Sequence, residues 1–358
     1  MKNNIIVTGG AGFIGSNFIL DILGASNSNT PDLIINLDCL TYAGNLENLE
    51  SLKDNSRYTF VKGSITDKTL VAKLFKEYQP CTLIHFAAES HVDRSIRDSG
   101  DFIETNIIGT YTLLESARQY FNTLNEEDQA QFRFLHVSTD EVYGSLSKNE
   151  APFSEENKYE PNSPYSASKA SSDHLVRAWY HTYQLPTLIT NCSNNYGPYQ
   201  FPEKLIPLCI FNALANKPIP IYGDGKQIRD WLYVKDHCKA IQSVLIKGEV
   251  GETYNIGGLN EKTNIEVVNQ ICQLLDQLKP RADGKSYVKQ IQFIQDRPGH
   301  DKRYAIDASK LQSKIGWKPE DSFESGLNKT IHWYLDHQEW ASHISNGEYQ
   351  YWIEKHYS

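Results

Sequence analysis

The feature that most constrains this chain is a glycine turn close to its start, between a short apolar run and an amphipathic segment. Ile5–Thr8 predicts a buried strand and Ile14–Leu23 predicts a helix. Between them stands Gly9-Gly10-Ala11-Gly12-Phe13-Ile14-Gly15, in which Gly9, Gly12 and Gly15 recur at every third position. Glycine allows a tight turn and a close approach of backbone to pyrophosphate, while N–H groups at the helix start favour its charge. The pattern predicts a dinucleotide site, with an ordinary β–α turn as the alternative.

The second predicted strand ends on an acid. Asp38 follows Asn36-Leu37 and lies 23 residues after Gly15, where a carboxylate can accept hydrogen bonds from the two adenosine ribose hydroxyls. The same carboxylate would repel a 2′-phosphate, and no arginine follows immediately to offset it. The cofactor that we expect is therefore NAD, unless Asp38 is only a solvated acid at a strand end.

Short β-rich runs alternate with longer helical stretches through the first half of the chain. This alternation predicts an α/β fold, a Rossmann-type doubly wound parallel sheet with helices on both faces. The expected strands are Ile5–Thr8, Leu33–Leu37, Tyr58–Val61, Thr82–Phe86, Phe132–Ser138 and Thr187–Asn191. The expected helices are Ile14–Leu23, Asp67–Tyr78, Phe102–Phe121 and Pro164–Tyr183.

Turn-forming residues become dense after Asn191, which predicts a lobe boundary there. We expect residues 1–193 to form the NAD-binding domain. Trp231–Val234 and Tyr254–Gly257 look like segments that return to it, so 229–262 is assigned to the same domain. Residues 194–228 and 263–358 are then a smaller, discontinuous C-terminal lobe that binds the substrate.

Composition excludes several classes of protein. A net charge of −9 argues against a nucleic-acid partner, and no stretch approaches the roughly 20 apolar residues of a membrane span. The apolar run after Met1 is short and has no cleavage pattern, so we expect no export signal. The six cysteines form no CxxC pair and no cluster at metal-ligand spacing, which predicts reduced thiols in the cytoplasm and no metal. Cys39 and Cys192 remain the candidates for a catalytic cysteine.

Tyr165-Ser166-Ala167-Ser168-Lys169 places a phenol and an ammonium four residues apart, on one face of the predicted helix 164–183. A neighbouring cation favours the phenolate. Tyr165 is therefore a candidate base, and its specificity comes from the glycine turn that precedes it at this distance.

These features belong to a wider resemblance that runs nearly end to end. The chain resembles the extended short-chain dehydrogenases/reductases, and most closely the nucleotide-sugar 4,6-dehydratases among them. The matching segments are Thr8–Gly15, Ala87–Asp93, Ser138–Gly144, Tyr165 with Lys169, Asn194–Pro198, Arg229–Trp231 and Asp296–His300. The alternative within enzymes is a nucleotide-sugar epimerase or decarboxylase, and outside them an idle NAD-binding scaffold or redox sensor.

The resemblance implies a set of cofactor neighbours. They are Gly9, Gly12, Phe13, Ile14, Gly15, Asp38, Cys39, Leu40, Thr41, Ser64, Ile65, Phe86, Ala87, Ala88, Ser90, Thr105, Tyr165, Lys169 and Asn195. One position departs from the family, which usually has Asp-Ile where this chain has Ser64-Ile65. A serine accepts the adenine hydrogen bond less strongly, so we expect weaker affinity for NAD.

Thr139-Asp140-Glu141 follows a predicted buried strand, at the sheet edge where ligands of such folds bind. Elimination of water needs a base and an acid, and two carboxyl groups in different environments can supply them. The resemblance implies that Glu141 takes the C5 proton, Asp140 protonates the departing C6 oxygen, and Thr139 hydrogen-bonds the C4 oxygen beside Tyr165. Epimerases generally lack this acid pair.

The resemblance also implies the substrate side. The expected contacts are Ser90, Thr139, Asn194, Lys204, Pro220, Ile221, Tyr222, Arg229, Asn264, Asp296, Arg297, Pro298, Gly299 and His300. The expected substrate is a nucleotide sugar, dTDP-glucose, with UDP-glucose left open. A homodimer is expected, because relatives pair through helices that correspond to 102–121 and 164–183.

Overall fold

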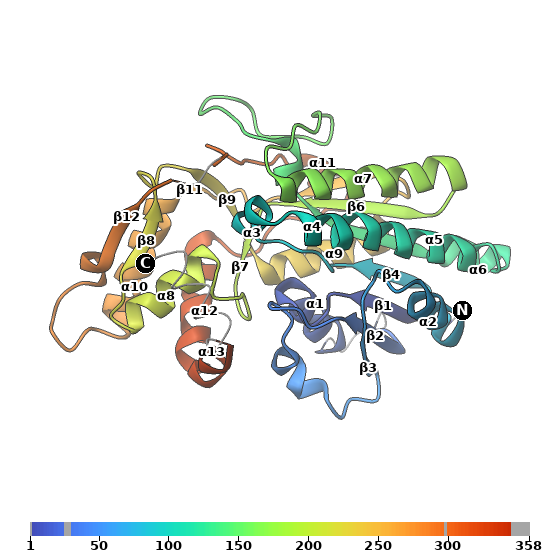
Figure 1. Cartoon of the computed structure of the whole chain (residues 1–358), viewed down its shortest axis with the longest axis horizontal. Helices are drawn as coiled ribbons and strands as arrows, with labels where there is room; N and C mark the ends of the chain where they lie inside the picture. The colour runs from blue at the N-terminus through green and yellow to red at the C-terminus, as the bar shows by residue number, and fades with distance from the viewer. Residues whose placement is uncertain (1, 25–29, 297–298, 345–358) are drawn as a thin grey trace.

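A computed structural model describes residues 2–24, 30–296 and 299–344. Its centre is a seven-stranded parallel sheet in the order β10-β6-β5-β4-β1-β2-β3, with helices on both faces (Figure 1). The expected doubly wound α/β fold is therefore confirmed. The strands are β1 (Asn4–Thr8), β2 (Leu33–Asp38), β3 (Tyr58–Lys62), β4 (Thr82–His85), β5 (Arg133–Thr139), β6 (Thr187–Cys192) and β10 (Thr253–Ile256).

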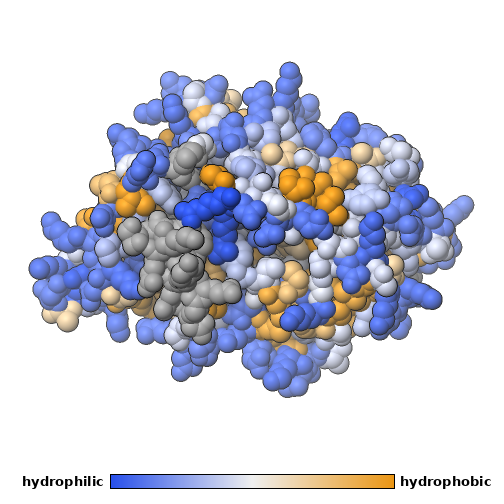
Figure 2. All heavy atoms as spheres, viewed as in Figure 1, coloured by the Kyte–Doolittle hydropathy of each residue, from blue (hydrophilic) through white to orange (hydrophobic). Residues whose placement is uncertain are grey.

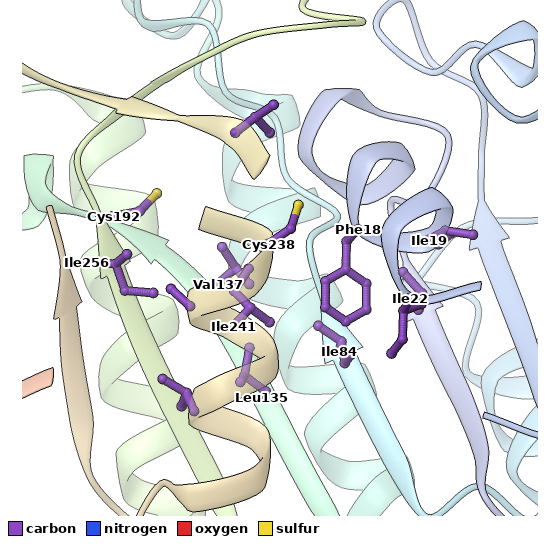
Figure 3. Packing of buried hydrophobic residues seen from close by; sticks show 14 of the residues in the cluster. Phe18, Ile19, Ile22, Ile84, Leu135, Val137, Cys192, Cys238, Ile241 and Ile256 are labelled. Atoms are coloured by element: carbon purple, nitrogen blue, oxygen red, sulfur yellow. The ribbon is translucent and has the colours of Figure 1, made fainter. Parts of the chain in front are cut away.

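The helices of this part divide between the two faces of the sheet. On one face α1 (Phe13–Gly24) and α9 (Val234–Lys247) pack together, followed by α11 (Ser309–Ile315). Phe18 and Ile22 of α1 meet Ile241 of α9 over strands β4 and β5 (Figure 3). Burying one such side chain stabilises the fold by roughly 1.5 to 3 kcal/mol. The other face carries α2 (Lys68–Tyr78), α5 (Thr110–Phe121) and α7 (Pro164–Tyr183).

Helix α7 begins and ends where the sequence predicts. The Ser163 side chain accepts a hydrogen bond from the Ser166 N–H, and Pro164 occupies the first helical position, where a missing N–H costs nothing. The predicted helix 102–121 is different, because α4 (Gly100–Phe102) leads into a π-helical segment, Ile103–Gly109, before α5 begins. The remaining elements of the first half are α3 (Val92–Arg97), α6 (Glu126–Gln131) and 3-10 turns at Leu46–Leu52 and Asp140–Tyr143.

A second core holds the C-terminal elements together around Tyr196, Trp231 and Phe323. It contains the sheet β11-β9-β7 and the pair β12-β8. The strands are β7 (Asn194–Tyr196), β8 (Ile219–Tyr222), β9 (Ile228–Tyr233), β11 (Glu261–Thr263) and β12 (Ile291–Ile294). The helices are α8 (Leu205–Leu214), α10 (Asn264–Leu278), α12 (Phe323–Asp336) and α13 (Gln338–Ile344), with a 3-10 turn at Tyr287–Gln290.

Parts of the C-terminal half pack against the first lobe. Strand β10 is an edge strand of the seven-stranded sheet, whereas β9 pairs with β7 and β11 and forms a β-bridge between Ile228 and Arg303. Leu311, Ile315 and Trp317 lie in the core beside α9, and Ile306 forms a β-bridge with Phe153. We therefore propose a two-lobe division in which 234–256 and 303–317 belong with the NAD-binding lobe.

Candidate active site

A cavity of about 300 Å³ opens at the carboxyl ends of strands β1, β2, β4, β5 and β6. Ligands of open α/β sheets bind at this edge. Predicted residues that line it are Gly9, Gly12, Phe13, Ile14, Gly15, Asp38, Cys39, Thr41, Ser64, Ile65, Phe86, Ala87, Ala88, Ser90, Thr105, Thr139, Glu141, Tyr165, Lys169, Asn194, Asn195 and Lys204. The cavity therefore joins the glycine turn, the Tyr–Lys pair and part of the acid pair.

The glycine turn has no room for side chains. Gly9 has a φ of +70°, and a Cβ there would lie 2.6 Å from the Ala87 backbone nitrogen. A Cβ on Gly15 would lie 2.3 Å from the Gly9 carbonyl oxygen. Both distances are far below contact, so Gly9 and Gly15 must present bare backbone to the cavity at the start of α1. Such a cradle fits the pyrophosphate of a dinucleotide.

Asp38 is held at the end of β2 by two backbone donors. Its Oδ2 accepts from the Ala11 N–H at 2.9 Å and its Oδ1 from the Leu40 N–H at 2.8 Å. Burial raises the carboxyl pKa, and the bonds from Leu40 and Ala11 lower it. Each oxygen keeps a lone pair for a ribose hydroxyl, which fits NAD. Leu40 does not line the cavity, and its backbone serves to orient Asp38.

Ser64 directs its hydroxyl toward its own loop. Its Oγ lies 2.8 Å from Thr66 Oγ1 and accepts from the Thr66 N–H at 3.1 Å. Ser64 still lines the cavity, but these contacts compete for the oxygen that would meet adenine. Asn195 also lines the cavity, and its Oδ1 lies 2.9 Å from His237 Nδ1.

Tyr165 and Lys169 occupy one face of α7, as the four-residue spacing predicts. Burial raises the pKa of the Tyr165 phenol well above its usual value, and the Glu141 carboxylate raises it further. Lys169 Nζ donates to the Val137 carbonyl at 2.9 Å and lies 3.3 Å from His136 Nε2. The expected lowering of the phenol pKa by Lys169 is therefore outweighed in the protein alone, because the ring is desolvated and the ammonium contacts β5.

The two neighbouring carboxyl groups lie in different environments. Glu141 lines the cavity, whereas Asp140 is 1% exposed and is not among the lining residues. Burial raises the pKa of Asp140 well above its usual value, with Glu141 and Asp230 adding to the shift. Asp140 Oδ1 accepts from the Thr139 hydroxyl at 3.4 Å, and its Oδ2 has no hydrogen-bond partner among the described residues. Asp140 thus connects to the cavity through the Thr139 hydroxyl.

Among the second-lobe residues that the structure describes, Lys204 is a cation that lines the cavity. It belongs to the segment before α8 and donates to the Ser90 carbonyl at 2.9 Å. Tyr222 also joins the lobes, because its hydroxyl donates to Asp93 at 3.0 Å. Arg229 is buried over the Tyr304 ring and donates to the Asp301 carbonyl at 3.0 Å. Its charge lowers the pKa of Asp140, so Arg229 lies near the acid pair without lining the cavity.

The other expected substrate residues lie apart from the cavity lining. Asp296 Oδ1 is 2.6 Å from His300 Nδ1, and Asp296 Oδ2 accepts from Gln227 at 3.1 Å. Pro220 and Ile221 belong to β8, Asn264 begins α10, and Gly299 has a φ of +64°. Arg297 and Pro298 lie outside the described residues.

The structure adds acids that the sequence motifs did not identify. Glu89 and Glu203 both line the cavity. Glu203 accepts from the Tyr42 hydroxyl at 3.1 Å, and burial raises its pKa to about 7 although Lys204 and Arg94 lower it. Its position beside Lys204 was the available signal, since a charged pair in a turn-rich segment can belong to a site. Asn106 was also missed, and its side chain bonds both the N–H and the carbonyl of Glu89, at 2.9 and 3.0 Å.

The two candidate cysteines do not have the features of nucleophiles. Cys192 lines the cavity, but burial raises the pKa of its thiol to about 12. Cys39 is exposed as a residue, but its sulfur is partly shielded from solvent. This partial burial, and then the negative charge of Asp38, raise the pKa of the Cys39 thiol as well. A thiolate is the reactive form, so neither environment favours nucleophilic catalysis. In the residues described here no group of His, Cys, Asp or Glu is arranged to hold a metal ion.

The glycine cradle, the ribose acid and the Tyr–Lys pair together define an NAD-dependent enzyme of the extended short-chain dehydrogenase/reductase class. A family model described as GDP-mannose 4,6 dehydratase matches residues 6–330. The dTDP-glucose 4,6-dehydratase of Xanthomonas campestris pv. campestris strain B100 is 59% identical, with 96% of this chain and 97% of the relative covered. The enzyme of the same name from Shigella flexneri is 57% identical, with 99% and 98% covered.

A solved structure shows the same likeness. The dTDP-glucose 4,6-dehydratase of Bacillus anthracis, in complex with NAD, has a TM-score of 0.83 and 50% identity, with 95% of this chain and 99% of that chain covered. The chain belongs to the family of nucleotide-sugar 4,6-dehydratases that contains the dTDP-glucose 4,6-dehydratases. Across the described ranges, the model contains no helix with the length and apolarity that a membrane crossing requires.

Proposed function

We propose that the protein converts dTDP-glucose to dTDP-4-keto-6-deoxyglucose and water, as an NAD-dependent hydro-lyase of deoxysugar biosynthesis. The observation that carries this proposal is the acid pair Asp140 and Glu141 beside Tyr165, in a chain with dTDP-glucose 4,6-dehydratases as relatives at 57 and 59% identity. An epimerase needs only the Tyr–Lys pair, and a scaffold needs neither pair. The acid pair therefore favours elimination.

The residues that would hold NAD fit it. The Gly9–Gly15 turn would hold the pyrophosphate and Asp38 the adenosine ribose, and Tyr165 and Lys169 line the same cavity. When bound, NAD accepts a hydride from the sugar and later returns it, so no net oxidant is consumed. The structure supports the fit through the bare backbone at Gly9 and Gly15 and the two oriented oxygens of Asp38.

Tyr165 takes the proton of the C4 hydroxyl as C4 becomes a ketone, and Thr139 hydrogen-bonds the C4 oxygen. Because burial raises the phenol pKa in the protein alone, Tyr165 needs positive charge in the cavity to act as a base near neutral pH. Lys169 on the same helix face provides one positive charge, and the oxidised cofactor adds another.

Glu141 and Asp140 carry the elimination. The C4 ketone acidifies the C5 hydrogen, Glu141 removes it, and Asp140 supplies the proton with which the C6 hydroxyl leaves as water. Burial raises the pKa of Asp140, so this carboxyl group keeps its proton to a higher pH than usual. A general acid must hold a proton before it can donate one. Its link to the cavity is the Thr139 hydroxyl at 3.4 Å.

On the substrate side, Ser90, Asn194 and Lys204 line the cavity and are proposed to contact the sugar nucleotide. Arg229 of β9 and the loop residues Asp296 and His300 are proposed to meet the nucleotide and diphosphate, with dTDP-glucose preferred over UDP-glucose. We place the enzyme in the cytoplasm. We also propose a homodimer, because Ile103, Ile108 and Tyr183 are exposed and Figure 2 shows hydrophobic surface on the face that carries α4 and α5.

The test is turnover of the purified holoenzyme with dTDP-glucose and with UDP-glucose at matched concentrations, with no second substrate. The expected result is a 4-keto-6-deoxy sugar without net accumulation of NADH, and a higher kcat/KM for dTDP-glucose. Formation of the C4 epimer without loss of water would support the epimerase instead. Absence of any product from both nucleotides would refute the proposal.

A further inference from the structure

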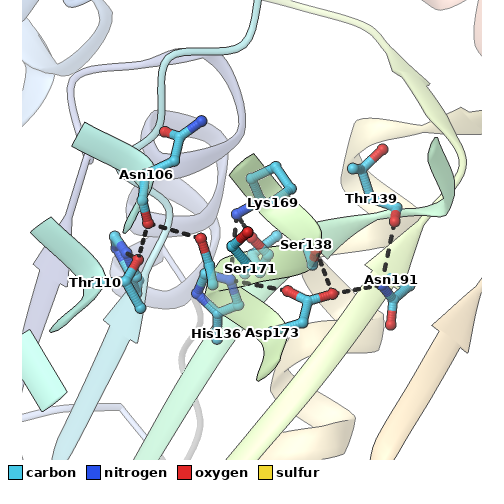
Figure 4. Close-up of polar contacts among 12 residues, drawn as sticks. Asn106, Thr110, His136, Ser138, Thr139, Lys169, Ser171, Asp173 and Asn191 are labelled. Carbon is cyan, nitrogen blue, oxygen red and sulfur yellow. Dashed lines mark hydrogen bonds and ion pairs between the residues drawn. The ribbon is translucent and has the colours of Figure 1, made fainter. Parts of the chain in front are cut away.

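A third polar residue continues the row formed by Tyr165 and Lys169. Asp173 lies four residues beyond Lys169 on α7, so the three side chains follow one another along the same helix face. All three are buried, with exposed fractions of 8%, 3% and 2%. Figure 4 shows Lys169 and Asp173 directed toward strand β5 on either side of His136.

The His136 side chain lies between the two charged groups, and one of its nitrogens is close to both of them. Its Nε2 lies 3.3 Å from Lys169 Nζ and 3.2 Å from Asp173 Oδ1. The ring is fully buried, and burial followed by the charge of Lys169 lowers its pKa to about 4. A neutral imidazole therefore stands between an ammonium and a carboxylate at neutral pH.

The carboxylate of Asp173 is held by three donors. Its Oδ2 accepts from the Ser138 hydroxyl at 2.9 Å, the Tyr159 hydroxyl at 3.0 Å and the Asn191 amide at 3.2 Å. These residues come from β5, the loop before α7 and β6. The network therefore fixes this carboxylate one turn behind Lys169, where its charge raises the pKa of the lysine.

Lys169 needs such an anion, because a buried ammonium is costly without a partner. Burial lowers its pKa to about 8, and Asp173 is the first of the groups that raise it. The titratable groups that face Lys169 are Tyr165 and Asp173 on α7, His136 on β5, Cys192 on β6 and His85 on β4. Tyr165 and Cys192 have raised pKa values and both histidines lowered ones, so these four are neutral near pH 7.

We propose that Asp173, together with His136 beside it, is a positioning residue for the reaction, which keeps Lys169 in its charged form with its ammonium at the Val137 carbonyl of β5. The Tyr–Lys unit of the site is then a unit of four residues. This inference rests on the proposed function for its catalytic meaning, while the charge state of Lys169 can be measured without turnover.

The first test follows Lys169 directly, by NMR of the protein with NAD bound and its lysines labelled with ¹³C at Cε. Loss of a signal in Lys169→Met assigns the resonance, and a pH titration gives its midpoint. Asp173→Asn should lower that midpoint by about one pH unit or more, since removal of a nearby opposite charge shifts a pKa by about 1 to 3. Tyr159→Phe is the matched control, because it removes one donor but retains the carboxylate, and its midpoint should move much less. An unchanged midpoint in Asp173→Asn would overturn the proposal.

The second test is the pH dependence of kcat/KM with dTDP-glucose. Asp173→Asn should retain a rate close to the parental one at pH 6 and lose about tenfold at pH 8.5, because fewer Lys169 side chains are charged there. His136→Phe keeps the ring shape and should shift the alkaline limit in the same direction, which provides the test if Asp173→Asn does not fold. A uniform loss at every pH in both variants would show a structural role alone and refute the proposal. Failure of the parental enzyme to convert dTDP-glucose would refute the proposed function and leave the NMR test valid.

Discussion

Asp140 and Glu141 are neighbours in the chain but differ in exposure, and this difference separates their proposed roles. Glu141→Gln removes the base while its size is kept, so the variant should still oxidise C4 and accumulate bound NADH. It should exchange no C5 proton with solvent. Asp140→Asn should allow some exchange but slow the loss of water by about 10² to 10⁴-fold, the usual contribution of general acid catalysis. Tyr165→Phe should stop both stages.

Single-turnover absorbance of NADH, combined with mass spectrometry of the sugar, measures these variants together. If Glu141→Gln formed the 6-deoxy product at the parental rate, Glu141 would not be the base. The case for elimination over epimerisation would then lose its main support at residue level.

The buried Asp140 also predicts how stability varies with pH. Because burial raises its pKa, the folded protein holds this proton to a higher pH than the unfolded chain does. Between the two values the unfolded chain binds fewer protons, so the stability of the parental protein decreases as pH rises. Asparagine does not titrate, so the Asp140→Asn protein does not lose stability in this way. The melting temperature of Asp140→Asn, relative to the parental protein, should therefore increase between pH 4 and pH 8, and thermal unfolding at both values checks it.

Ser64 gives a prediction for the cofactor. Ser64→Asp restores the acid usual in the family and should tighten NAD binding by up to about tenfold, since one hydrogen bond contributes about 0.5 to 1.5 kcal/mol. Thr66→Val removes the hydroxyl that lies 2.8 Å from Ser64 Oγ, and serves as the control for a change in the loop alone. Calorimetric titration of the protein freed of NAD measures both. Equal affinity in parental and Ser64→Asp proteins would contradict the expected weakness.

At the residue scale, the sequence predicted which residues share a helix face but not which distant residues they contact. The spacing of Tyr165 and Lys169 predicts a shared helix face, which the structure has. It does not predict that Lys169 contacts His136 and Val137, because those contacts come from β5, more than 30 residues earlier in the chain. Asp173 looks like an ordinary helical acid in the sequence, and only the packing of α7 on the sheet makes it part of the site.

Elements were predictable where local signals agree. Strands with continuous β-branched and apolar runs, and α7 with its serine cap and Pro164, end within one residue of their predicted bounds. A continuous α-helix was expected over 102–121, and no local sequence signal marked the π-helical segment within it. In that segment the Asn106 side chain hydrogen-bonds the Glu89 backbone. That requirement comes from another loop and is not visible in helical periodicity.

The glycine turn gives a prediction for an element. Gly15→Ala places a methyl group 2.3 Å from the Gly9 carbonyl oxygen, so the turn must open, and both NAD retention and thermal stability should fall. A loss of roughly 1 to 3 kcal/mol is typical of such overpacking. Gly24→Ala, at the end of the same helix with no described atom within 4 Å of the new Cβ, should be neutral or slightly stabilising. NAD content after gel filtration and melting temperature measure both, and equal behaviour of the two variants would contradict the cradle.

For the whole molecule, a cavity that joins cofactor and substrate residues predicts that the hydride stays within it. Substrate deuterated at C4 should yield product with deuterium at C6, even with unlabelled NADH in the buffer. Mass spectrometry of the product measures the label. Washout of deuterium into the NADH pool would contradict a cycle completed on one enzyme molecule. The packing of Leu311, Ile315 and Trp317 in the core beside α9 was not predictable, because it depends on contacts between segments far apart in the sequence.

Cys39 offers a way to follow occupancy in an unmodified sample. It is the exposed thiol among the cysteines that the structure describes, it lines the cavity next to Asp38, and four of the others are buried. An alkylating reagent should therefore modify Cys39 first, and a ligand over Asp38 should protect it. The rate of alkylation then becomes a footprint of the adenosine pocket, which can rank cofactor analogues without an assay of turnover.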